Sequence, residues 1–158
     1  MTPNSFVKTL TLIHSVLIMG LVTFAGVSLY LGNGEINFDF NTEDTFLIIL
    51  PVLAITALVL SRIIPQKLLE STKETQDLRK ILTQYQTASI IKYALIEGPA
   101  LIGIVMFMST SNAAFLAISG VLIIYLLLQK PTKTKIENEL KLRGEPRNQF
   151  MKYDEKID

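Results

Sequence analysis

The 158-residue chain contains no cysteine and only one histidine, His14. Disulfides, thiol nucleophiles and cysteine metal sites are therefore excluded, and so are the multi-histidine sites of intramembrane metalloenzymes. The sequence also lacks phosphate-binding loops, nucleophile elbows and zinc-binding signatures. From these absences we predict that the protein is not an enzyme and that it uses no cofactor and no metal.

Charged residues are also scarce: they make up 18% of the chain, whereas hydrophobic residues make up 49%. The formal net charge of +1 gives little attraction for a polyanion, so we expect no nucleic-acid partner. Charge is nearly absent from four long apolar stretches, which leave little chain for a separate soluble domain. We predict one integral membrane domain, all-α, over residues 1–158.

The four apolar stretches predict transmembrane helices at about 10–31, 45–64, 88–108 and 112–129. About 20 helical residues cross the hydrocarbon core of a bilayer, which is about 30 Å thick. The first stretch exceeds the 7–15 residues or so that are typical of a signal peptide, so we expect it to be retained. A tight turn at 109–111 joins the last two helices, which predicts two antiparallel hairpins in all.

The basic residues predict the orientation. All 15 Lys and Arg residues lie before the first stretch, between residues 62 and 92, or after residue 129. The connection 32–44 is acidic instead. The positive-inside rule therefore places both termini and the middle connection in the cytoplasm. Four aromatic residues are expected at the outer interface: Tyr30, Phe38, Phe40 and Phe46.

Two segments are expected to form short amphipathic cytoplasmic helices. Apolar residues recur at helical spacing within 66–86, which predicts a helix that lies on the membrane surface or extends the third span. It serves either as a connector or as a docking helix for a partner. The C-terminal segment 130–158 is expected to hold a short helix that Thr132 or Thr134 caps, followed by a mobile tail from Arg147.

A faint internal repeat links the first and third stretches. Segment 13–20 aligns with 91–98, and Ile, Leu, Ile and Gly recur at matching positions. Two hairpins in parallel orientation would be related by a pseudo-twofold axis along the membrane normal. In that arrangement His14 and Lys92 are symmetry mates.

Glu97 is the most informative polar residue of the spans. By helical rise it lies about 13–14 Å from the cytoplasmic edge of the third stretch, near the bilayer midplane. A carboxylate at that depth costs at least about 2.5–3.5 kcal/mol, so it should face the bundle or a water-filled cavity. Pro99 cannot donate to the Leu95 carbonyl, which leaves that oxygen free to accept. Glu97 is either a proton or cation site or a structural polar contact.

Lys92 and His14 complete the candidate intramembrane polar site. Lys92 lies about 7.5 Å nearer the cytoplasm than Glu97 and about 140° around the helix, so the two do not pair. We expect Lys92 to extend its amine to the interface. His14 lies at the matching depth in the first span, where it either relays protons to Glu97 or makes a polar contact within the bundle.

Small residues and prolines suggest how the helices pack. Ala94 and Gly98 form a small-xxx-small pair, as do Ala113 and Ala117. Three glycines extend this set of expected helix contacts: Gly20, Gly26 and Gly103. Pro51 and Pro99 lie inside their spans and are expected to kink them.

A resemblance to known proteins rests on two segments: 85–98, which ends in Glu97-Gly98, and 130–137, which begins with Lys130-Pro131. The chain resembles the small four-span membrane proteins of unknown function found in bacterial genomes, which implies an inner-membrane location but no activity. A fainter likeness is to the double-hairpin proteolipid subunits of rotary ATPases. The chain departs from that family because it lacks the glycine repeat, carries its acid in the third helix and has its termini inside.

We expect an accessory or interaction subunit of a bacterial inner-membrane complex, which forms homo-oligomers or binds a partner through its cytoplasmic helices. The lipid bilayer is its other partner. The alternative is a small proton- or cation-linked transporter or channel that uses Glu97.

Overall fold

The computed structural model describes residues 1–32, 36–38, 45–72 and 75–157. Three of its helices are long and apolar enough to cross a membrane, and α4 with α5, bent by 85° at their junction, makes a fourth candidate. The prediction of an all-α membrane protein is confirmed. The helices within the described residues are α1 (Pro3–Leu31), α2 (Thr45–Glu70), α3 (Leu78–Thr110), α4 (Ala113–Leu128), α5 (Lys133–Leu140) and α6 (Gly144–Met151).

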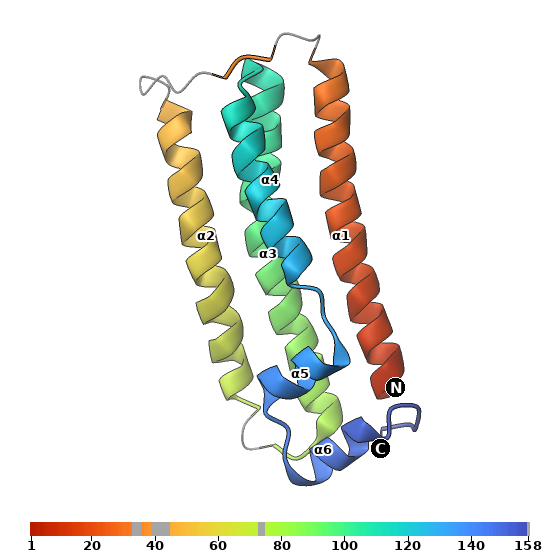
Figure 1. The fold of residues 1–158 in the computed structure, drawn as a ribbon. Helices are drawn as coiled ribbons and strands as arrows, with labels where there is room; N and C mark the ends of the chain where they lie inside the picture. Colours follow the sequence, from red (N-terminus) through yellow and green to blue (C-terminus); the bar gives the residue numbers. More distant parts are fainter. Residues whose placement is uncertain (33–35, 39–44, 73–74, 158) are drawn as a thin grey trace.

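Helix α3 is the centre of the bundle. It packs against α2, α4 and α1, and its buried side includes Tyr93, Ile96, Ala100 and Ile104. Figure 1 shows α1 and α2 on opposite sides of the α3–α4 pair, with both chain termini at one end. We call this end, which also carries α5 and α6, the basic end, and the opposite end the loop end.

The two predicted hairpins differ. The α3–α4 hairpin forms, because Ser111 takes a left-handed conformation (φ 55°) and Asn112 caps α4 by accepting from the Ala114 amide at 3.0 Å. By contrast, α1 and α2 pack against α3 and α4 rather than against each other. The expected pair of equivalent hairpins is therefore wrong, because the long connection lets α1 and α2 settle on separate sides of α3.

Of the two interpretations of 66–86, a helix on the membrane surface and an extension of the third span, the structure has the second, for residues 78–86. Helix α2 continues through Pro65 to Glu70, and α3 already begins at Leu78, where the Asp77 side chain accepts from the Lys80 amide. The apolar positions at helical spacing were real but belong to the first turns of α3, where Leu78, Leu82 and their neighbours are buried. Span three thus extends well beyond its apolar stretch.

The C-terminal segment is packed, not mobile as predicted. Phe150 of α6 and Ile136 of α5 are both fully buried. The Asn4 amide donates to the Tyr153 carbonyl at 3.0 Å, and the Ile157 amide donates to the Met1 carbonyl at 3.0 Å. Although the tail is rich in charged residues, its buried apolar side chains are enough to hold it against the N-terminus.

At the loop end, the first connection touches the α3–α4 turn. The Asn37 amide donates to the Ser111 carbonyl at 3.0 Å, and the Asn37 carbonyl accepts from the Ala113 amide at 2.8 Å. Tyr30, Phe38 and Phe46 are exposed. Phe40 and the four acidic residues of this connection lie outside the described residues.

Candidate functional site

The two charged residues of span three lie on opposite sides of α3. Ser89 and Ile96, one turn before and after Lys92, are both buried, so Lys92 projects from the packed side of the helix. Ala94 and Leu101, one turn before and after Glu97, are both exposed, so Glu97 belongs to the outward side.

Lys92 is half-buried at the basic end of the bundle. Its ammonium interacts electrostatically with Glu139 and Lys135, which follow α4, and with Arg62 of α2. Within the described residues it makes no hydrogen bond and no ion pair. The sequence predicted that Lys92 extends its amine to the membrane interface. The structure instead directs the side chain inward, among side chains of other helices.

Glu97 stands apart from this group. Its side chain is half-buried, and among the described residues no side chain or backbone group bonds to it. The flanking outward residues of α3 are apolar and exposed, among them Leu101 and Val105. Glu97 is therefore a carboxyl group on an apolar outer face, not a group that faces the interior of the bundle as predicted.

His14 makes the structural contact that the sequence left open. Its Nε2 donates to the Leu126 carbonyl at 2.8 Å, and its ring lies edge-on to Tyr93 with centroids 5.0 Å apart. Leu126 is in the last turn of α4, and its carbonyl also accepts from the Gln129 amide at 2.9 Å. His14 thus ties α1 to the end of α4. The relay between His14 and Glu97 is not found.

Sequence reasoning missed two further polar contacts at the depth of His14 and Lys92. Arg62 Nε donates to the Tyr125 hydroxyl at 3.2 Å, which joins α2 to α4. Lys135 Nζ donates to Gln129 Oε1 at 3.2 Å, which joins α5 to the end of α4. A signal was present: His14, Arg62 and Lys92 each lie about 26–27 Å, by helical rise, from the loop end of their helix. We call these polar residues the polar layer: His14, Arg62, Lys92, Tyr125, Gln129 and Lys135.

Below the polar layer, Tyr85 fixes α5 to α3. Its hydroxyl donates to Glu139 Oε2 at 2.6 Å.

Of the predicted small-residue contacts, Gly103 is confirmed, whereas Gly20, Ala94 and Gly98 do not lie where the helices meet. A Cβ added at Gly20 or at Gly98 would have nothing within 4 Å, and Ala94 is exposed. The close contact lies at Gly103, where an added Cβ would press on Ser119 of α4 and on Leu50 of α2. Helix α2 runs through Pro51 and α3 through Pro99.

The described residues contain no group of three His, Asp or Glu side chains that could hold a metal ion. No protein-family model matches the chain, and no curated protein or solved structure is significantly similar to it. The resemblances drawn from the sequence therefore stay hypotheses.

Proposed function

We propose that the protein is a non-enzymatic accessory subunit of a bacterial inner-membrane complex, and that it binds another membrane protein through the outward face of α3. The face consists of Ile90, Ala94, Glu97, Leu101 and Val105. In this proposal the basic end faces the cytoplasm, as the positive-inside rule requires.

Glu97 is the observation that carries the proposal. Measured from Lys92 in the polar layer, it lies about 7.5 Å farther toward the loop end. Apolar side chains flank it, and none of the described groups of the chain bonds to it. Because a polar group without a partner is costly in hydrocarbon, a helix that supplies a donor at this depth would remove that cost.

The chemistry of Glu97 defines the partner. A carboxyl group is satisfied by an Arg, Lys or His cation, or by a hydroxyl or amide donor. We therefore propose a transmembrane helix of a different protein that carries such a side chain at the same depth. The small residues Ala94 and Gly98, which contact no other helix of this chain closely, would let that helix approach.

A crosslinking experiment tests the proposal. A photoreactive residue at Leu101, on the Glu97 face, is compared with one at Ile55, an exposed residue of α2, in native membranes. We expect Leu101 to capture one membrane protein through a helix with a donor side chain at the matching depth. Glu97→Leu should abolish the capture, and replacing the partner's donor by Leu should do the same.

Three outcomes would overturn the proposal. Equal capture from Leu101 and Ile55 would show that the Glu97 face is not special. Capture of a second copy of this chain would replace the partner by a homo-oligomer. Capture that survives Glu97→Leu would remove the carboxyl group from the interface.

The transporter alternative has less support, because His14 is buried against Leu126 and Tyr93, whereas Glu97 belongs to the outward side of α3, and the two share no contact. In proteoliposomes that contain only this protein, we expect the proton flux to equal that of empty vesicles. A flux that Glu97→Gln abolishes would contradict the accessory role.

A further inference from the structure

Two cations bond to side chains at the end of α4. Arg62 of α2 donates to the Tyr125 hydroxyl, and Lys135 of α5 donates to Gln129 Oε1. Both lie within electrostatic reach of Lys92 of α3, together with one acid, Glu139. Helix α4 ends at Leu128, so by helical rise it is only about 24 Å long, and α5 then turns away by 85°.

The cations are only partly neutralised by the chain itself. Glu139 is already engaged, because its Oε2 accepts the Tyr85 hydroxyl at 2.6 Å. Lys92 has no hydrogen-bond acceptor among the described residues. Arg62 and Lys135 bond to uncharged groups, the Tyr125 hydroxyl and the Gln129 amide oxygen. Three positive charges thus face one negative charge, and the excess attracts an anion.

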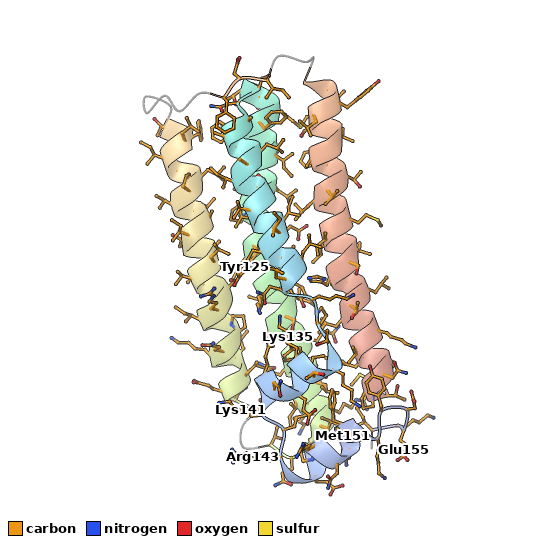
Figure 2. The ribbon with its side chains drawn as sticks, viewed as in Figure 1. Tyr125, Lys135, Lys141, Arg143, Met151 and Glu155 are labelled. Atoms are coloured by element: carbon orange, nitrogen blue, oxygen red, sulfur yellow. The ribbon has the colours of Figure 1, made fainter. Side chains whose placement is uncertain are left out.

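Two of the polar groups can be followed in Figure 2. Tyr125 lies near the end of α4, and Lys135 lies on α5 below it in this view. The Tyr125 ring lies under the Arg62 guanidinium, 5.9 Å from its carbon to the ring centroid, and so helps to position that donor. Arg62 keeps its remaining N–H groups for a ligand, since only Nε is bonded to Tyr125.

We propose that Arg62, Lys92 and Lys135 form a binding site for a phosphate group, and that its source is the headgroup of an anionic phospholipid. The polar layer lies where the apolar stretches of α2 and α4 give way to charged residues, which is the level of lipid phosphates. Guanidinium and ammonium groups are the usual donors to phosphate. This site is independent of the Glu97 face, which lies on the other side of α3.

Stability in lipid nanodiscs tests the site. Wild type is compared in discs of phosphatidylcholine alone and in discs that also contain phosphatidylglycerol, and bound lipid is counted by native mass spectrometry. We expect phosphatidylglycerol to raise the unfolding temperature and to be retained selectively. Lys92→Gln should reduce this retention about five-fold, because one direct donor to the phosphate is lost. Lys8→Gln removes an exposed lysine of α1 and serves as the matched control.

A second variant and a second ligand source complete the test. Lys135→Gln should show the same loss even if Lys92→Gln folds poorly. Inorganic phosphate is added to wild type in phosphatidylcholine discs, and stabilisation that Lys92→Gln and Lys135→Gln remove would support the phosphate site but assign it to a soluble ligand. The proposal is overturned if neither source stabilises wild type, or if Lys8→Gln loses as much retention as the two site variants.

Discussion

At the residue scale, Lys92 and Glu97 are five positions apart on α3 and lie in opposite environments. Lys92 points among the other helices and Glu97 points away from them. The sequence predicted their angular separation correctly, because that follows from helical geometry. It could not predict which of the two faces inward, since both sides of α3 are apolar and the choice depends on how α1, α2 and α4 surround it.

Gly103 is the position where a single methyl group should matter most. An added Cβ would meet the Ser119 hydroxyl, the Phe115 carbonyl at 3.0 Å and Leu50 at 3.1 Å. We expect Gly103→Ala to destabilise the bundle by about 1–3 kcal/mol because the helices must move apart. Gly98→Ala, where the added group meets nothing, should be neutral or slightly stabilising. Unfolding in mixed micelles measures both, and equal effects would contradict the packing described.

His14 is expected to act through structure. His14→Ala removes a buried hydrogen bond to Leu126 and the contact with Tyr93. We expect a loss of about 2–4 kcal/mol in the free energy of unfolding, from the lost hydrogen bond and the cavity together. Ser15→Ala, at an exposed neighbour on α1, is the control and should change little. Unchanged stability of His14→Ala would show that α1 does not depend on this bond.

At the element scale, apolar runs located the spans but not the ends of the helices. The predicted span 88–108 lies inside the longer α3, and 45–64 lies inside α2. A hydropathy pattern reports where lipid ends, whereas a helix ends where its capping residues lie, as at Asp77. Likewise, the charged tail gave little warning that Phe150 would be buried, because one aromatic residue makes no periodic signal.

The contact between α5 and α3 depends on one charged hydrogen bond. Tyr85→Phe removes the hydroxyl that bonds to Glu139 and leaves that carboxylate beside Lys92. We expect a loss of about 1.5–3 kcal/mol locally, which hydrogen exchange would show as faster exchange of the α5 amides. Tyr30→Phe alters a tyrosine that is 87% exposed and should leave exchange unchanged. Slow exchange in Tyr85→Phe would mean that apolar packing alone holds α5.

The docking of α6 should depend on Phe150. Phe150→Ala empties a fully buried site and is expected to cost about 3–5 kcal/mol, enough to release the C-terminal segment. Limited proteolysis should then remove residues after α5 much faster than in wild type. Met151→Ala, next to it but half exposed, is the control. Equal cleavage of both variants would refute the packed tail.

At the scale of the whole molecule, several polar side chains of the bundle bond to other elements, whereas the Glu97 carboxyl group lies on its outer face. His14, Arg62 and Lys135 all bond to groups of other elements at the polar layer, whereas Glu97 bonds to none of the described residues. The composition predicted the membrane class. The outward position of Glu97 needed the tertiary arrangement, and it is the basis of the proposed partner.

The outward position of Glu97 is best tested by the oxygen accessibility of spin labels on α3 in nanodiscs. Because the chain has no cysteine, each introduced cysteine is labelled uniquely. We predict high oxygen accessibility at Ala94 and Leu101, on the Glu97 face, and low accessibility at Ile96 and Ala100. The reverse pattern, with Ile96 and Ala100 facing lipid, would place Glu97 inside the bundle and contradict the account.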